Sequence, residues 1–170
     1  MNKCITIFLL TFSAFLAEAQ TLSVPEAIQP PLAQHSALSL HAQGEQLYQC
    51  TVAAGVYAWE FVKPEAKLYR QQQLIGTHSQ GPSWRDNTGG YVKAKLLAEM
   101  ADPKAVSIPW LLLKVVKQQG HGLLSTTSYI NRVNTVGGLK PITGCDSNHL
   151  GLVKGVSYSA DYIFYQPNHD

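Results

Sequence analysis

Apolar and polar residues alternate with a period of two through most of the chain. The pattern is clear in ALSLHA (37–42), in VYAWEFV (56–62) and in VSYSADYIFY (156–165). Successive side chains of a β-strand point to opposite faces, so each segment reads as a strand with one buried face. In the second segment Tyr57 and Trp59 lie on the face opposite Glu60.

Two further segments extend this reading. YVKAKLLAEM (91–100) alternates in the same way, which predicts a strand with its apolar residues on one side and Lys93, Lys95 and Glu99 on the other. The residues expected on its apolar side are Val92, Ala94, Leu96, Ala98 and Met100. IPWLLLKVV (108–116) is apolar on both faces, which is typical of a strand buried on both sides. The turn QQGHG and the strand-forming LLSTTSYINRVNTV follow it, so we expect a long antiparallel hairpin.

The sequence therefore predicts an all-β fold: a single-domain antiparallel β-sandwich or barrel over residues 36–170. No amphipathic helix pattern, internal repeat or low-complexity tract interrupts the strands. Residues 20–35 contain Pro25, Pro30 and Pro31 and show little periodicity, so we expect an extended lead-in along the surface or a sheet edge.

The first 19 residues have the pattern of a cleaved signal peptide. Lys3 precedes an apolar run from Ile5 to Leu16, and Ala17-Glu18-Ala19 forms a small-x-small cleavage site. The apolar run is shorter than the about 20 residues that a membrane helix needs. We therefore expect a secreted or periplasmic protein with no membrane span after signal cleavage.

Charge and cysteine content narrow the classes of partner. The chain has 13 basic and 11 acidic residues, and loss of Lys3 and Glu18 with the signal peptide leaves the net charge at +2. The basic residues are scattered, which makes nucleic acid and anionic membranes poor candidate partners. Cys50 and Cys145 remain after cleavage, and we expect them to form a disulfide. Thiolates that bind a metal are the alternative, but these two cysteines lack a paired spacing.

Several blocks of the chain resemble one protein family. The blocks are HAQGEQLYQC (41–50), GTHSQGPSW (76–84), IPWLLL (108–113), YINRVNTVGGLKPITGC (129–145) and YSADYIFY (158–165). In this order and spacing they resemble the secreted bacterial and fungal proteins grouped as the domain of unknown function 3455. The resemblance spans nearly all of the expected mature chain and implies no particular activity.

The glycine-rich segments do not match known phosphate sites. Some fungal members of that family carry the label malate dehydrogenase, and a dinucleotide fold needs a GxGxxG turn that opens a helix. The nearest match, residues 120–125, lacks the third glycine and runs into strand formers. In RVNTVGGLKPITGCDSNH (132–149) no helix pattern follows the glycines either. We interpret that stretch as a strand end and a turn held by Cys145.

The histidines raise an alternative function. His41, His78, His121 and His149 can in principle converge on copper or zinc from different strands. No HxH or HxxxH pair places two of them on one element, and Asp146 near His149 is the best neighbouring carboxylate. A metal-binding protein or metal-dependent enzyme therefore remains the alternative, with no cofactor predicted by the main interpretation.

Catalytic motifs give no support for an enzyme. The chain lacks a GxSxG elbow, an HExxH pair and a P-loop, although Glu60, Asp86, Asp146 and Asp161 can supply carboxylates. The sequence favours a non-catalytic binding or envelope-associated protein, whose partner is a small molecule, a saccharide or an envelope component.

Three residues are candidates for contacts with such a ligand. Trp84 and Arg85 follow a Gly-Pro turn, where an indole can stack on a sugar or an aromatic ring, or can instead fill the core. Arg132 can hold an anion, although pairing with Asp146 or Asp161 is the expectation we favour. Trp59 and Trp110 fall in strand patterns and are expected in the core.

Overall fold

The computed structural model describes residues 24–168 of the chain, and the predicted signal peptide, residues 1–19, lies outside the described residues. The described part contains one short 3-10 helix and eight strands. In chain order they are η1 (Glu26–Ile28), β1 (Gln34–Ala53), β2 (Val56–Arg70), β3 (Gln73–Ser79), β4 (Ser83–Asp86), β5 (Tyr91–Met100), β6 (Trp110–Gln119), β7 (Tyr129–Gly137) and β8 (Val153–Pro167). Among these residues there is no helix with the length and apolar character needed to cross a membrane.

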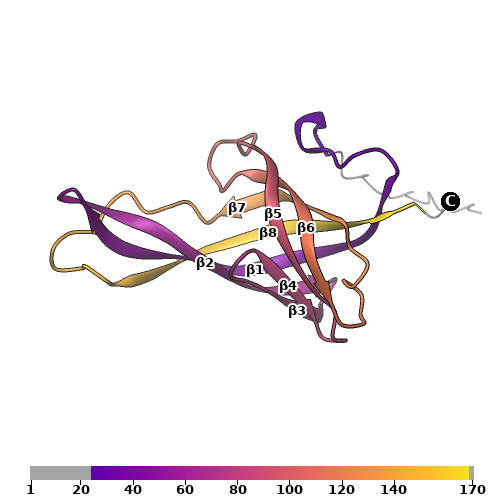
Figure 1. Ribbon diagram of the computed structural model, residues 1–170. Helices are drawn as coiled ribbons and strands as arrows, with labels where there is room; N and C mark the ends of the chain where they lie inside the picture. The colour runs from indigo at the N-terminus through magenta and orange to yellow at the C-terminus, as the bar shows by residue number, and fades with distance from the viewer. Residues whose placement is uncertain (1–23, 169–170) are drawn as a thin grey trace, which may run out of the picture.

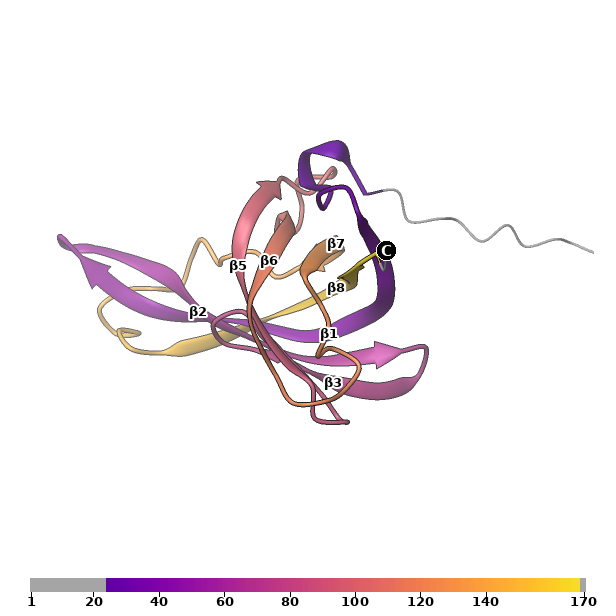
Figure 2. The same cartoon turned by 45° about the vertical axis from the view of Figure 1, so that its right-hand side comes forward.

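The eight strands form a closed barrel. Each strand pairs antiparallel with the next one in the chain, and β8 returns to pair with β1, as Figures 1 and 2 show. The predicted all-β antiparallel fold is confirmed, and the choice between sandwich and barrel is settled in favour of the barrel. The expected hairpin of IPWLLLKVV with the following strand is the β6–β7 pair. Its connection is longer than expected, because β7 begins only at Tyr129 and the predicted strand residues 123–128 belong to the turn.

Three long strands extend beyond the barrel and form an arm. The arm comprises the end of the β1–β2 hairpin, residues 47–63, and residues 138–157, which include the first part of β8. It projects to the left in Figure 1. A disulfide joins Cys50 to Cys145, as the sequence predicts, and fastens the 138–152 connection to β1. The Trp59 indole, 3% exposed, donates a hydrogen bond of 2.9 Å to the Thr143 carbonyl oxygen on the same connection.

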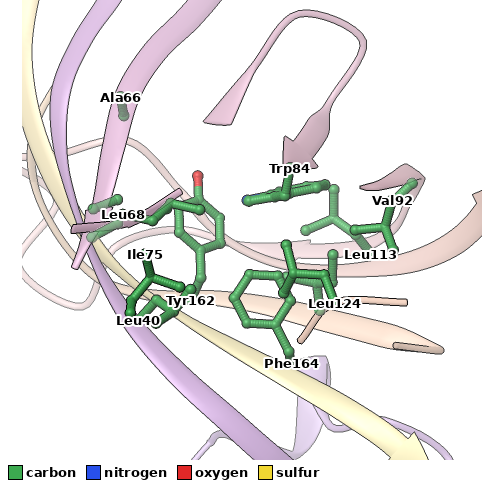
Figure 3. Close-up of a cluster of buried hydrophobic side chains, with 14 of the residues drawn as sticks. Leu40, Ala66, Leu68, Ile75, Trp84, Val92, Leu113, Leu124, Tyr162 and Phe164 are labelled. Carbon is green, nitrogen blue, oxygen red and sulfur yellow. The ribbon is translucent and has the colours of Figure 1, made fainter. Parts of the chain in front are cut away.

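The main core fills the barrel interior, and strand alternation explains which residues it contains. On β1 and β8 every second residue points inward, so that Leu40 lies opposite Tyr162 and Ala42 opposite Ala160. Figure 3 shows how the rings and aliphatic side chains of this core pack together. The core includes Leu40, Ala42, Ala66, Leu68, Ile75, Trp84, Val92, Ala94, Ile108, Leu113, Leu124, Ile130, Tyr158, Ala160, Tyr162 and Phe164.

A second, smaller core lies on the outer face of the barrel. Ile28 of η1 is fully buried there against Leu112, Val133, Ile163 and Tyr165. The lead-in thus covers the outer face of β6, β7 and β8. IPWLLL is apolar on both faces because one face packs in the barrel and the other packs under the lead-in. The described lead-in is not wholly extended, because η1 interrupts it.

The expected single apolar face of YVKAKLLAEM is wrong, although the segment is the strand β5. The register shift between Leu96 and Ala98 leaves Leu97 as an extra residue of β5 and breaks the alternation. A bulge adds one residue to a strand and moves the following side chains to the other face. Ala94 therefore packs in the barrel, whereas Ala98 packs in the outer core and Leu96 is 51% exposed.

The glycine-rich turn after β6 is held by a carboxylate of the chain itself. Asp86, 3% exposed, accepts hydrogen bonds from the backbone N–H groups of Thr88 (2.8 Å), Gly90 (3.0 Å) and Leu124 (2.9 Å). A Cβ on Gly122 would lie 2.6 Å from Asp86 Oδ1, so only glycine fits there. The backbone of 120–125 thus binds an internal carboxylate where a dinucleotide site would bind a phosphate.

Candidate functional site

Six polar or aromatic side chains face one another inside the barrel near its junction with the arm. We call them the interior polar cluster: Gln46, His78, Trp84, Arg132, Tyr158 and Tyr162. Five of the six are between 1% and 4% exposed, and Arg132 is partly exposed. Buried positions of this kind are usually apolar, so the concentration of polar atoms at one place needs a physical account.

Strand register brings the cluster together from five strands. His78 on β3 lies opposite Trp84 on β4, and Arg132 on β7 lies opposite Tyr162 on β8. Gln46 on β1 is two residues beyond Gly44, which pairs with Tyr158 on β8. Each of these positions belongs to the inward-facing set of its strand, so the pleat of the sheet directs all six side chains into the barrel.

Aromatic rings form the wall of the cluster. The rings of His78 and Trp84 are stacked, with centroids 4.4 Å apart and planes inclined by 11°. The Tyr162 ring approaches both edge-on, at 5.1 Å from His78 and 5.5 Å from Trp84. Figure 3 shows Trp84, Tyr162 and Phe164 side by side in the barrel. Contacts of this geometry give each ring a fixed orientation.

The hydrogen bonding of His78 fixes its tautomer. Nδ1 lies 2.9 Å from the Ser83 carbonyl oxygen, which can only accept, so Nδ1 carries the proton and donates. The pKa of His78 is lowered to about 3, chiefly by burial and in smaller part by the charge of Arg132, against the raising effect of the Ser83 hydrogen bond. The ring is therefore neutral near pH 7, and its Nε2 is an acceptor.

The tyrosines of the cluster are neutral hydroxyl groups. Burial raises the pKa of Tyr158 and of Tyr162 above the ordinary value, and for Tyr158 the neighbouring Tyr162 raises it further. Neither hydroxyl makes a hydrogen bond of normal geometry among the described residues, and the same holds for Gln46 Nε2 and Trp84 Nε1. The Tyr158 hydroxyl nevertheless lies beside Tyr162 and Gln46, and the Tyr162 hydroxyl beside Arg132. The cluster thus contains four fully buried polar atoms that the rest of the described chain does not satisfy.

Arg132 provides the only formal charge of the cluster at neutral pH. Its Nε and Nη2 donate to the Pro109 carbonyl oxygen at 3.1 and 2.8 Å. No carboxylate of the described residues lies within salt-bridge distance of its guanidinium. The expected pairing of Arg132 with Asp146 or Asp161 is therefore wrong.

The two aspartates have closer partners of their own. Asp161 lies on the outer barrel face, 2.8 Å from His41 Nδ1, and accepts a second hydrogen bond from Asn134. Asp146 lies on the arm, 2.7 Å from His149 Nδ1. Both carboxylates are thus engaged outside the barrel, and the charge of Arg132 has no counterpart within the cluster.

The backbone at Gly138 closes the cluster on the arm side. The Tyr48 hydroxyl donates a hydrogen bond of 2.6 Å to the Gly138 carbonyl oxygen. Gly138 has φ +76°, and a Cβ there would lie 2.9 Å from the Tyr158 Cβ and 3.1 Å from the Gln46 Cγ. Only glycine combines this conformation with so close an approach. The backbone at Gly138, directly after β7, therefore packs against the cluster and closes it on that side.

The other candidate residues lie elsewhere. His41 is on the outer barrel face, His149 on the arm, and His121 is exposed in the turn after β6, so none of them meets the buried His78. Within residues 24–168 no group of three or more His, Cys, Asp and Glu residues is placed to hold a metal ion.

The tryptophan and arginine candidates separate in the structure. Trp84 is 1% exposed within β4, which places its indole in the core and in the cluster and not on an open loop. Arg85, the next residue, points outward and stacks on the Tyr91 ring at 4.9 Å. Trp59 is buried on the arm, and Trp110 packs against the outer core.

Three members of the cluster were not among the candidates drawn from the sequence: Gln46, Tyr158 and Tyr162. A signal for them exists, because the strand period continues from Leu40 to Gln46, where an amide takes the place of an apolar side chain. Tyr158 and Tyr162 likewise share the inward face of Phe164. Polar groups on the inward face of a strand are the feature that identifies such residues.

The fold and the cluster together define a class: a small closed barrel of eight antiparallel strands, with a disulfide-fastened arm and a polar, singly charged interior. A family profile described as "Protein of unknown function (DUF3455)" matches residues 69–166, more than half of the chain. The chain belongs to this family. The match includes all of the cluster except Gln46. No curated protein and no solved structure matches the chain.

Proposed function

We propose that the protein is a secreted or periplasmic, non-catalytic binding protein that holds a small molecule at the interior polar cluster. The observation that carries the proposal is the set of four buried polar atoms without partners, next to an arginine without a counter-charge. The secretion signal read from residues 1–19 and the disulfide support the location, because disulfides persist in oxidising compartments.

The energetics favour a ligand over a purely structural role. A buried polar group that loses its bonds to water without gaining a partner costs about 1–3 kcal/mol. Four such groups make the free barrel less stable than an apolar interior of the same shape would be. A ligand or ordered water that accepts or donates these hydrogen bonds recovers that free energy.

The chemistry of the side chains suits binding more than catalysis. The cluster offers aromatic surface from the His78–Trp84 stack and hydrogen-bond donors from Trp84, Gln46 and the tyrosines. His78, with its pKa lowered to about 3, is a weak base at neutral pH. The residues therefore orient and hold a molecule, and none of them is activated as a nucleophile.

A thermal-shift screen of the mature protein tests the proposal. Saccharides, aromatic acids, amines and uncharged aromatic compounds are the four classes to compare. We expect at least one class to raise Tm, because a ligand that binds the folded state stabilises it. Tyr162→Phe should abolish this shift, whereas Tyr57→Phe on the exposed arm should leave it unchanged.

The stability of the ligand-free variant separates a ligand from a structural water. Tyr162→Phe removes an unpartnered hydroxyl, so the free protein should unfold at the same or a higher Tm. A screen without any stabilising compound would contradict the proposal. So would a Tyr162→Phe variant that is destabilised yet keeps every ligand-induced shift.

A further inference from the structure

We propose that the ligand of the interior polar cluster is a small carboxylate with a planar apolar body, bound at the free edge of the Arg132 guanidinium. The inference rests on the proposed function and adds the charge and shape of the ligand. It follows from three features of the cluster: an unbalanced positive charge, a set of donors, and an aromatic wall.

The positive charge comes from Arg132 and acts on the whole cluster. The guanidinium lowers the pKa of His78 and opposes the rise in pKa that burial causes at Tyr48, Tyr158 and Tyr162. No carboxylate of the described chain balances this charge at close range. A partly buried cation without a counter-charge attracts an anion, because the low dielectric of the barrel strengthens their interaction.

The geometry of the guanidinium selects the kind of anion. Arg132 has five N–H donors, and the Pro109 carbonyl oxygen occupies the edge formed by Nε and Nη2. The structure gives Nη1 no hydrogen-bond acceptor among residues 24–168. The edge formed by Nη1 and the second N–H of Nη2 has no hydrogen bond of normal geometry among these residues, although the Tyr162 hydroxyl lies beside the guanidinium and Arg132 lowers its pKa. A carboxylate fits such an edge with two parallel hydrogen bonds.

The remaining groups agree with an anion and disfavour a cation. Gln46 Nε2 and Trp84 Nε1 are donors, and the tyrosine hydroxyls can donate. His78 offers a neutral acceptor at Nε2, but within residues 24–168 no carboxylate lies at salt-bridge distance from Arg132. A cationic ligand would lie among N–H groups and beside Arg132, whereas a carboxylate finds donors on several sides.

The aromatic wall defines the part of the ligand that is not charged. The stacked His78 and Trp84 rings, with Phe164 beside Trp84 at 6.3 Å, present flat apolar surfaces. Flat surfaces of this kind favour a planar apolar group by stacking. An aromatic or unsaturated monocarboxylate combines this body with the charge that Arg132 requires.

A charge-matched series tests the inference on the unaltered protein. Benzoate, benzamide and benzamidine have nearly the same size and shape but differ in charge, and acetate, acetamide and acetamidine form a smaller matched series. Isothermal titration calorimetry of the mature protein should show benzoate or acetate binding at least tenfold tighter than the uncharged and cationic members. Raising the salt concentration should weaken that binding, because the interaction is between charges.

Variants at Arg132 then test whether its guanidinium is the group that binds the carboxylate. Arg132→Gln should weaken carboxylate binding at least tenfold and leave binding of the uncharged analogue unchanged. Arg132→Lys should recover part of the affinity, since it keeps the charge but loses the two-bond geometry. Arg85→Gln is the matched control, because Arg85 lies on the outer face against Tyr91 and should have no effect.

The outcomes distinguish the inference from the proposed function. If uncharged or cationic compounds bind and the carboxylates do not, the inference is wrong while the proposed function stands. Equal carboxylate affinity in the wild type and in a folded Arg132→Gln variant also overturns the inference. If no compound of any charge binds here or in the broader screen, the proposed function itself fails.

Discussion

Acidification provides a direct test of the environment assigned to His78. His78 is 3% exposed and stacked on Trp84, and burial lowers its pKa to about 3. In the unfolded chain a histidine titrates near pH 6.5. As the pH falls below that value the unfolded state takes up a proton first, which shifts the equilibrium towards unfolding. The stability that neutral His78 contributes is thus complete above about pH 6.5 and is lost as the pH falls towards 3.

The size of the effect follows from the same linkage. Within this window one group contributes about 1.4 kcal/mol for each pH unit. Between pH 6.5 and 5 the free energy of unfolding should therefore fall by roughly 2 kcal/mol through His78 alone. Burial raises the pKa of Asp86, but the hydrogen bonds from Thr88, Leu124 and Gly90 together lower it below its ordinary value, so Asp86 loses its contribution only below the ordinary carboxyl range. A measurement between pH 7 and 5 thus separates the two groups.

The comparison variant is His78→Asn. An asparagine amide can still donate to the Ser83 carbonyl oxygen, and it removes the titrating ring. The lost stacking on Trp84 should cost about 0.5–1.5 kcal/mol at every pH. Urea denaturation at pH 7, 6 and 5, followed by circular dichroism, gives both free energies by linear extrapolation. The difference in free energy of unfolding between the wild type and His78→Asn should decrease by roughly 2 kcal/mol across this range. Parallel curves for the two proteins would refute the reasoning and would mean that water reaches His78 in the folded barrel.

Two further predictions concern the elements that frame the cluster. Asp86→Ala leaves the N–H groups of Gly90 and Leu124 without an acceptor and should lower the free energy of unfolding by about 3–5 kcal/mol. Asp86→Asn keeps one acceptor oxygen and should lower it by roughly half of that. Equal losses for the two variants in urea denaturation would contradict this account. The Cys50–Cys145 bond closes a separation of 95 residues, so its reduction should cost roughly 4 to 5 kcal/mol in the chain-entropy model. Thiol titration of the denatured, unreduced mature protein should find no free thiol, and two free thiols would show that the bond does not form.

The sequence was sufficient for most of the strands and for the disulfide, because both depend on local or countable features, whereas β3 and β4 were not predicted and GTHSQGPSW was interpreted as a loop. The period of two identifies a half-buried strand without knowledge of its neighbours, and two cysteines outside the predicted signal peptide leave one intramolecular pairing. Barrel closure was not predictable in the same way, since the pairing of β1 with β8 leaves no mark on the period of either strand. The bulge of β5 at Leu97 was also missed, because YVKAKLLAEM alternates as an unbroken strand would.

The candidate site was predicted in fragments. His78, Trp84 and Arg132 were each singled out by residue type and motif, and the barrel brings these three together. Pairing of Arg132 with an acidic residue was expected from charge alone, but Asp146 and Asp161 each have a histidine closer in space. Which charged groups meet depends on the stagger of the strands around the barrel, and no single strand contains that information.

The position of Arg132 links the fold to the proposed function. On β6 and β8 its lateral neighbours are Leu111 and Tyr162, and Ile130 occupies the preceding inward position on β7. An aliphatic side chain at position 132 would continue that core, and replacing a buried charge by an apolar group of similar volume is often neutral or stabilising. The guanidinium therefore has no advantage for packing that a leucine or methionine lacks. Its hydrogen bonds to Pro109 satisfy only one edge of the group, and in the same cluster Gln46 Nε2 and Trp84 Nε1 are donors without an acceptor. A ligand with two acceptor oxygens can accept hydrogen bonds both from the guanidinium and from these donors. For this reason we assign the arginine to recognition and not to stability.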